Sequence, residues 1–175
     1  MPSLVGAGSL EIQLKWISLL NLSMNVVLDI SQFDKDCVHF HKPVRNTVMD
    51  NSNFIRVVYS NELFSLNGLF VKFSLRNAKV ERYFAKFKCN FSEADNKEVV
   101  QQLINLEEEI LRRAGIKGKL YSCKIREQLR AGTIKLFANE PDDQVGNNFI
   151  LKVSGVWETA DEVGVTFKFI DSHHT

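Results

Sequence analysis

The sequence has none of the short motifs by which most enzyme active sites are recognised. It lacks a GxSxG elbow, an HExxH pair, a phosphate-binding P-loop and a GxGxxG turn, which serve nucleophilic, metal-dependent and nucleotide-dependent chemistry. Glu107, Glu108 and Glu109 are consecutive on a predicted helix, so they fan around it instead of converging on one substrate. We expect most of these carboxylates to face solvent, and we predict a protein that is not an enzyme and needs no cofactor.

Cysteine is scarce. The three cysteines, Cys37, Cys89 and Cys123, form neither a CxxC pair nor an even-numbered framework, which disfavours a secreted disulfide scaffold and favours a reducing compartment. Cys89 and Cys123 fall at predicted inward strand positions, where a buried apolar role is usual. Cys37, His39 and His41 alternate along the chain, but zinc normally takes four ligands and no second ligand pair is nearby, so we predict no metal site.

A long uninterrupted hydrophobic run is also absent. Residues 10–30 are rich in Leu, Ile and Val, but polar residues interrupt them, including Glu11, Gln13, Lys15, Asn21 and Asn25. The stretch is therefore too polar for a membrane span. It also lacks the basic n-region and small-residue cleavage site of a signal peptide. We expect a cytoplasmic or nuclear protein with no membrane partner.

One domain is expected from a chain of 175 residues, of which 45% are hydrophobic and 25% charged, because this composition can bury a globular core. Residues 1–23 differ from the rest of the chain, since they begin with a small-residue lead and Met24 begins a more regular alternation. They are either a leader or N-terminal extension, or an amphipathic helix or strand packed on the domain. We assign a single β-rich domain to residues 24–171 and a frayed tail to residues 172–175.

Thirteen Phe residues, against two Trp and three Tyr, favour a β-rich domain. Alternating apolar residues predict strands at 54–60, 69–75, 80–91, 120–125, 133–137, 149–157 and 163–170. The last two form a closing hairpin across residues 158–162, and a short helical turn is expected over residues 126–131. The predicted class is α+β, mainly antiparallel β, with an OB-like, partly closed barrel.

One long helix is predicted over residues 96–114, between the two groups of strands. Its apolar residues recur at helical spacing, at Val99, Leu103, Leu106, Ile110 and Ala114. Asp95 is expected to cap the first turn, with Glu98 completing a capping box. Gly115 is expected to end the helix in the left-handed conformation.

Positive and negative charges nearly balance, at a formal net charge of +1, but they are segregated along the chain. Cations concentrate in residues 72–88 and again in residues 112–135, where Glu127 is the only acidic residue. Acids gather in residues 93–109 and 158–162. Positive charges that are separated from the negative ones in this way can attract an anionic partner even when the net charge is near zero.

The strongest indication of function is a predicted hairpin, in which residues 69–75 pair with residues 80–91 across a turn at residues 76–79. Because successive strand residues point to opposite sides, one face would be buried and the other exposed. The buried face would contain Leu69, Val71, Phe73, Leu75, Tyr83, Ala85, Phe87, Cys89 and Phe91. The exposed face would be basic and aromatic, with Phe70, Lys72, Arg76, Arg82, Phe84, Lys86 and Lys88.

Such a face suits a single-stranded nucleic acid, because cations follow the phosphates while aromatic rings stack on exposed bases. The cations predicted to hold phosphates are Lys72, Arg76, Arg82, Lys86, Lys88, Lys124, Arg126, Arg130 and Lys135, and the rings predicted to stack are Phe70, Phe84 and Trp157. In the alternative, the long helix or the N-terminal segment covers Phe70 and Phe84, and the cations only solubilise an outer face.

The closing segment FILKVSGVWETADEVGVTFKFI, residues 149–170, contains Lys152, Ser154-Gly155-Val156-Trp157, Gly164 and Phe167-Lys168-Phe169. It resembles the closing segment of OB-type single-stranded DNA-binding proteins of large DNA viruses and virus-like mobile elements. Residues 52–75 and 124–137 are similar in a more general way, so the resemblance spans residues 24–170. It implies a non-enzymatic protein that coats single strands during replication or repair, with Trp157 as a core anchor or a stacking residue.

The chain departs from this family at its C-terminus. Such proteins often end in an acidic tail that recruits replication partners, whereas this chain ends in Ser172-His173-His174-Thr175. We therefore predict sequence-tolerant binding of single-stranded DNA or RNA as the function. The alternative is a structural or scaffold protein that self-associates through its β-rich surface, and a homo-oligomer is compatible with either function.

Overall fold

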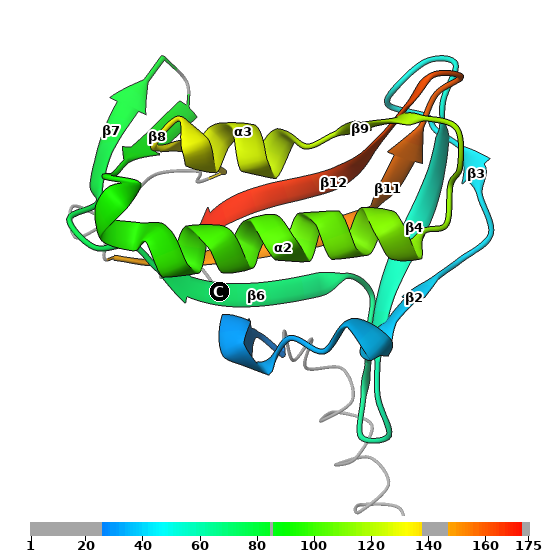
Figure 1. The fold of residues 1–175 in the computed structure, drawn as a ribbon, viewed down its shortest axis with the longest axis horizontal. Coiled ribbons are helices and arrows are strands. Elements are labelled where there is room, and N and C mark those ends of the chain that lie inside the picture. The colour runs from blue at the N-terminus through cyan, green and yellow to red at the C-terminus, as the bar shows by residue number, and fades with distance from the viewer. Residues whose placement is uncertain (1–25, 85, 138–146, 173–175) are drawn as a thin grey trace, which may run out of the picture.

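The computed structural model describes residues 26–84, 86–137 and 147–172. Strands dominate it, and one long helix, α2 (Lys97–Arg113), lies across the sheet (Figure 1). The strands are β1 (Leu28–Asp29), β2 (Val38–Phe40), β3 (Val44–Arg45), β4 (Asn53–Ser60), β5 (Ser65–Leu66), β6 (Leu69–Ser74), β7 (Lys79–Tyr83), β8 (Lys86–Asn90), β9 (Leu120–Ser122), β10 (Thr133–Leu136), β11 (Asn148–Glu158) and β12 (Glu162–Asp171). The remaining elements are α3 (Lys124–Arg130) and the 3-10 turns η1 (Ile30–Gln32), η2 (Lys35–Cys37) and η3 (Ala94–Asn96).

The β11–β12 hairpin is the centre of the sheet, and its position confirms the predicted closing hairpin. The main path of hydrogen-bonded strands runs β1-β6-β11-β12-β10-β8-β7. β6 pairs with the first half of β11, and β4 pairs with its second half after a bulge between Val153 and Gly155. Shorter strands from earlier in the sequence pair along the outer edges of this hairpin, β4 and β6 with β11 and β9 and β10 with β12.

The core lies between this sheet and α2. Leu69, Val71 and Phe73 of β6 point inward, as predicted, and the apolar stripe of α2 is buried against the sheet, with Leu103 and Ile110 fully covered. Cys89 also lies in this core, as predicted, and burial raises the pKa of its thiol to about 12. Tyr83 was expected inside but is exposed, because β7 continues beyond the edge of the core.

The helix prediction is confirmed, but its capping prediction is wrong. The turn η3 precedes α2, so Asn96 rather than Asp95 occupies the cap position, and its side chain makes no capping bond. The Asn96 amide instead accepts a hydrogen bond from the Arg76 N–H and donates to the Arg76 and Ser92 carbonyls. Gly115 ends the helix with φ of 67°, as predicted.

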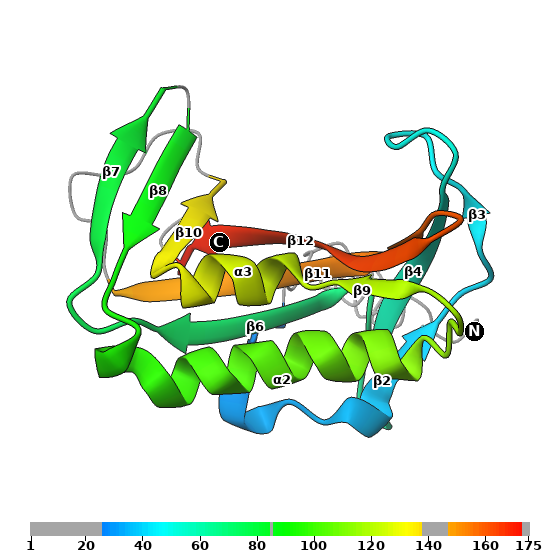
Figure 2. The ribbon, with the colours of Figure 1, turned by 45° about the horizontal axis from the view of Figure 1, so that its top comes forward.

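The predicted hairpin between residues 69–75 and 80–91 is wrong. β6 pairs with β1 and β11, whereas β7 pairs with β8 across a turn at Phe84, and β6 and β7 lie far apart along the sheet (Figure 2). Alternation identifies which side of a strand is buried, but it carries no information about which strand lies beside it. The turn at residues 76–79 therefore leads away from the centre of the sheet.

The fold is α+β, mostly β-sheet with one long helix, and the sheet is not closed into a barrel. The strand predicted over residues 120–125 ends at Ser122, because Lys124 and Ile125 already belong to α3, which begins two residues earlier than predicted. The proposed leader, residues 1–23, and the last residues of the tail, 173–175, lie outside the described residues. Within the described part of the chain, no helix has the length and apolar character needed to cross a membrane.

Candidate functional site

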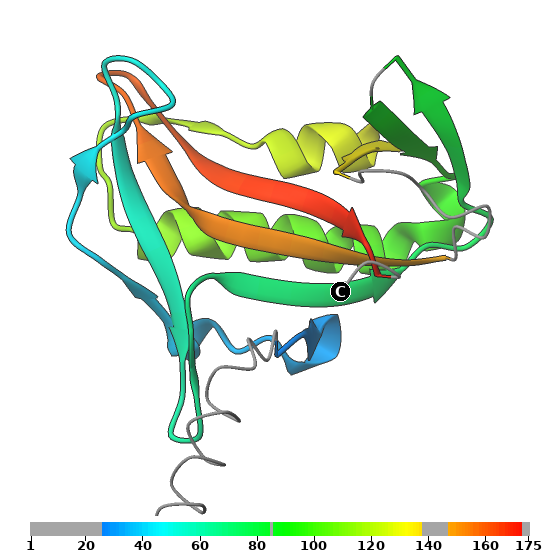
Figure 3. The same cartoon turned by 180° about the vertical axis from the view of Figure 1, so that it is seen from behind.

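One face of the sheet is left free of helices by the described residues. Seen from behind, β6, β11 and β12 lie in front of α2 (Figure 3). Strand registry places alternate residues of β6, β11 and β12 on the side of the sheet away from α2. Lys135 of β10 and Phe137, directly after β10, lie on the same side. We call the following set the basic sheet face: Phe70, Lys72, Lys135, Phe137, Lys152 and Lys168.

A cross-strand row of lysines and phenylalanines forms the middle of the basic sheet face. Phe70, Lys152 and Lys168 are register partners on β6, β11 and β12. The Lys152 Nζ lies 4.9 Å from the centroid of the Phe70 ring, and the Lys168 Nζ lies 4.6 Å from that of Phe137. These cation–π contacts keep cations and rings together at the surface without carboxylates.

The four lysines of the basic sheet face are not neutralised by ion pairs within the part of the chain that the structure describes. Asp29 is the register partner of Lys72. The pKa of Asp29 is lowered mainly by hydrogen bonds from Ser31, with a smaller contribution from the charge of Lys72. The face therefore keeps most of its positive charge available to an external anion.

An apolar row lies beside these cations. Lys72, Ile150 and Ile170 are register partners, and Ile150 is only 2% exposed although it is outside the core beneath α2. An apolar row among cations offers the long stems of lysine side chains a surface on which they can lie. The basic sheet face is thus a packed surface with charged side-chain ends, not a set of isolated lysines.

The hairpin β7–β8 carries only part of the predicted site. Lys86 and Lys88 lie on the same side of the sheet as Lys135, and the Lys88 Nζ is 3.8 Å from the Glu81 carboxylate and 5.3 Å from the centroid of the Tyr83 ring. Arg82, in contrast, shares the opposite side of the hairpin with Phe87. The single face predicted for Arg82, Lys86 and Lys88 is therefore wrong.

Two other predicted residues lie in turns. Phe84 was expected within a strand, but it lies at the turn between β7 and β8 with φ of 55° and is 84% exposed. Its ring contacts Tyr83 edge to face at 4.9 Å between centroids. Arg76 follows β6, where its backbone is held by Asn96 and its residue is exposed. Neither belongs to the basic sheet face.

The second basic stretch is largely paired with acids, contrary to the expectation that only Glu127 opposes it. Lys124 contacts Glu127 at 2.8 Å, Arg126 pairs with Glu108, and Arg130 pairs with Glu93. Two of these carboxylates come from α2 or from the segment before it, which tertiary packing brings beside α3. Lys124, Arg126 and Arg130 are therefore poor candidates for phosphate binding, whereas Lys135 remains one.

Most of the three consecutive glutamates were expected to face solvent, but Glu107 is fully buried. Its carboxylate accepts hydrogen bonds from the backbone N–H groups of Ile125, at 2.9 Å, and Arg126, at 2.8 Å. These N–H groups belong to the first turn of α3, where carboxylates are favoured. Burial nevertheless raises the pKa of Glu107 above its ordinary value, because desolvation outweighs these hydrogen bonds.

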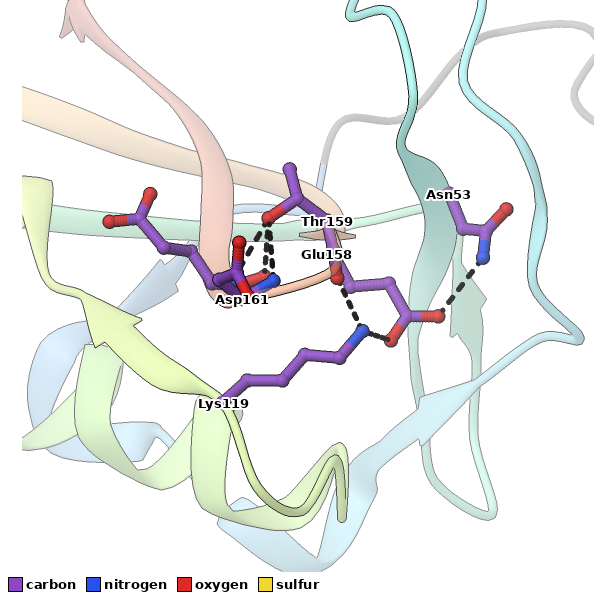
Figure 4. A network of polar contacts seen from close by, with 6 residues as sticks. Asn53, Lys119, Glu158, Thr159 and Asp161 are labelled. Carbon is purple, nitrogen blue, oxygen red and sulfur yellow. Dashed lines mark hydrogen bonds and ion pairs between the residues drawn. The ribbon is translucent and has the colours of Figure 1, made fainter.

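A second network holds the turn that joins β11 to β12 (Figure 4). The Lys119 Nζ donates to Glu158, at 2.7 Å, and to the Thr159 carbonyl, at 2.5 Å, while the Asn53 amide donates to the same carboxylate at 3.2 Å. The pKa of Glu158 is lowered, first by Lys119 and then by Asn53. The network joins β4, the segment after α2 and the end of β11, and it removes Lys119 from the set of available cations.

The far half of the helix-free side contains a groove of about 630 Å³ beside Phe54, Arg56 and Trp157. Trp157 is half-buried, which fits neither a fully covered core anchor nor a free surface ring. Registry places Gly155 opposite Arg56, and Trp157 opposite both Phe54 and Gly164. The groove is therefore built where β4, β11 and β12 meet, and Phe54 of β4 and Trp157 of β11 form its floor.

No group of three or more side chains suited to a metal ion occurs in the described residues. Cys37 is half-buried in η2, and His39 is exposed in β2. Scans of protein-family models, curated proteins and solved structures each found no match to this chain. The functional conclusion therefore depends on the residues and geometry of the chain itself.

Proposed function

We propose that this protein binds single-stranded nucleic acid through the basic sheet face, without an enzymatic activity. The observation that carries the proposal is the cross-strand row in which Lys152 and Lys168 lie over Phe70 and Phe137, with no carboxylate partner among the described residues. Single-stranded nucleic acids present what such a row recognises, a chain of phosphates and a series of flat bases. Coating of single strands during replication, and an OB-like origin of the sheet, belong to the same proposal.

Both components of the contact are available on one surface. The flexible stems of Lys152 and Lys168 can follow phosphates, and their movement frees the outer faces of Phe70 and Phe137 for stacking. Base stacking on an aromatic ring contributes roughly 1–3 kcal/mol for each base and tolerates any sequence. The proposal therefore includes little sequence preference on this part of the surface.

Salt dependence of oligonucleotide binding tests the proposal. Four phosphate contacts, one for each lysine of the face, give a slope of log affinity against log salt of about −2.8, since each contributes about −0.7 on single strands. The measurement is fluorescence anisotropy of a labelled oligothymidylate at several salt concentrations. Absence of binding at low salt would contradict the proposal.

A double variant, Lys152→Gln with Lys168→Gln, localises the contact. We expect binding at low salt to weaken about tenfold or more and the slope to become shallower by about 1.4. The matched control is Lys97→Gln with Lys117→Gln, which removes the same charge from two exposed lysines of α2 and the turn after it. Equal losses in both double variants would show that general charge, not the basic sheet face, governs binding.

A further inference from the structure

The groove beside Trp157 has a floor of two aromatic rings that lie directly on backbone. A Cβ atom added to Gly155 would come within 2.5 Å of two atoms of the Phe54 ring, and one added to Gly164 would come within 2.5 Å of the Trp157 ring. The two glycines therefore leave the space that the rings occupy. Each ring rests on the strand on one side and can present its other side to the groove.

The lining of the groove is mostly apolar, with Val44, Val48 and Met49 in its walls, and cations and polar groups lie among these residues. β3 contributes Arg45, and the segment between β3 and β4 contributes Asn46 and Thr47. β4 contributes Arg56, whose guanidinium lies 5.7 Å from the centroid of the Phe54 ring. Arg56 also donates to the Asn67 side chain at 3.0 Å, which orients it. Two guanidinium groups line the groove and none of its described lining residues is acidic, so its charge favours an anionic ligand.

We propose that this groove binds one nucleotide of a single strand, with the base stacked on Trp157 and the phosphate held by Arg45 and Arg56. A nucleotide joins a flat aromatic ring to an anion, which is the combination that the floor and walls present. Planar guanidinium groups bind phosphate oxygens through paired hydrogen bonds. The volume of about 630 Å³ lies within the usual range of small-molecule sites.

The groove and the basic sheet face lie along the same strand. Lys152 and Trp157 are five residues apart on β11, or about 17 Å. One nucleic-acid strand can therefore contact the lysines and place a base in the groove. The contact of one strand with both surfaces rests on the proposed function, but nucleotide binding by the groove can be measured by itself.

The groove also offers polar groups to the edge of a base. Asn46, Thr47 and Thr166 line it, and their side chains can form hydrogen bonds with the base. We therefore expect base selectivity in the groove and not on the row of lysines.

Tryptophan fluorescence tests the groove directly. The chain has two tryptophans, so Trp16→Phe leaves Trp157 as the only one. In that background we expect saturable quenching by a single nucleotide such as thymidine monophosphate, and stronger binding by oligothymidylate. Nucleotides carrying different bases should differ in affinity. Absence of saturable quenching at millimolar nucleotide, together with oligonucleotide binding that leaves Trp157 unquenched, would overturn the inference.

Arg56→Gln is the informative variant, since Arg56 is exposed and does not belong to the core. We expect it to raise the Kd for the mononucleotide about tenfold, because the phosphate loses its charged contact with Arg56. Gly164→Ala should displace the Trp157 ring and reduce quenching. Lys152→Gln is the control, and it should weaken oligonucleotide binding while leaving mononucleotide binding unchanged. An Arg56→Gln protein that binds mononucleotide as well as the parent does would contradict the inference.

The outcomes separate the two proposals. Salt-dependent oligonucleotide binding that is unaffected by Arg56→Gln and does not quench Trp157 would overturn the groove and leave the basic sheet face intact. Saturable mononucleotide quenching without oligonucleotide binding would support the groove and overturn the basic sheet face. Quenching by a detergent or an apolar peptide, but not by nucleotides, would assign the groove to an apolar partner and overturn the inference.

Discussion

At the level of single residues, two glutamates of the same helix have different roles because one is buried and the other is not. Glu107 and Glu108 are neighbours on α2, yet Glu107 is fully buried beneath α3 while Glu108 is half-exposed and pairs with Arg126. The Glu107 carboxylate replaces the missing hydrogen-bond acceptors of the first turn of α3. One carboxylate thus connects the two helices through backbone groups, independently of the surface ion pairs.

Removal of the Glu107 carboxylate should therefore destabilise the protein. We expect Glu107→Ala to lower the free energy of unfolding by about 2–3 kcal/mol, because two backbone N–H groups lose their acceptor and a cavity remains. Urea denaturation followed by circular dichroism measures the change. The matched control is Glu108→Ala, which removes an exposed ion pair and should cost less than about 1 kcal/mol. Equal costs for the two variants would refute the capping role.

The same residue predicts a pH dependence. Because the pKa of Glu107 is raised in the folded state, its contribution to stability is greatest below the ordinary carboxyl pKa and is lost as pH rises through the folded pKa. The comparison is with Glu107→Gln, which cannot titrate. We expect the stability of the parent minus that of Glu107→Gln to fall as pH rises above the ordinary carboxyl pKa of about 4.3. A difference that increases with pH would show that the folded pKa is lowered instead.

At the scale of elements, the strands and the helix are largely predictable, but their partners are not. The alternation in β6 identifies Leu69, Val71 and Phe73 as buried, and the spacing in α2 identifies its apolar stripe. Neither pattern distinguishes β7 from β11 as the neighbour of β6. The pairing depends on long-range contacts with the C-terminal hairpin, which short sequence patterns do not record.

The turn at Phe84 gives a prediction at this scale. Phe84 is 84% exposed and has φ of 55°, a conformation that favours glycine. We expect Phe84→Ala to change the free energy of unfolding by less than about 1 kcal/mol, and Phe84→Gly to raise it by about 1 kcal/mol, because glycine relieves the left-handed strain. Thermal and urea denaturation measure both variants.

Phe73→Ala provides the contrasting variant, since Phe73 is 2% exposed and contacts the rings of Phe149 and Phe169. We expect it to cost about 3–5 kcal/mol. A comparable cost for Phe84→Ala would show that the β7–β8 turn packs on the body of the protein. An effect of Phe84→Ala on nucleic-acid affinity without loss of stability would extend the interface to the hairpin.

At the scale of the whole molecule, folding separates the cations into two populations. Arg126 and Arg130 of α3 meet acids from α2 and the segment before it, and Lys124 pairs with Glu127 of α3 itself. Lys72, Lys152 and Lys168 instead gather on the side of the sheet away from α2. A net charge of +1 therefore conceals one surface on which positive charge is not compensated by the described residues. The salt slope and the paired lysine variants test whether that surface governs binding.

The sequence alone predicts the α+β class, the long helix, the closing hairpin and the buried side of β6, because these depend on the local spacing of apolar residues and on Gly115 at the helix end. It also placed Phe70, Lys72 and Trp157 among the candidate contacts. Only the tertiary structure brought Phe70 beside Lys152, buried Glu107 under α3 and paired Arg126 and Arg130 with acids. Those contacts join residues far apart in the chain, so their geometry depends on strand order and helix packing, which local patterns do not specify.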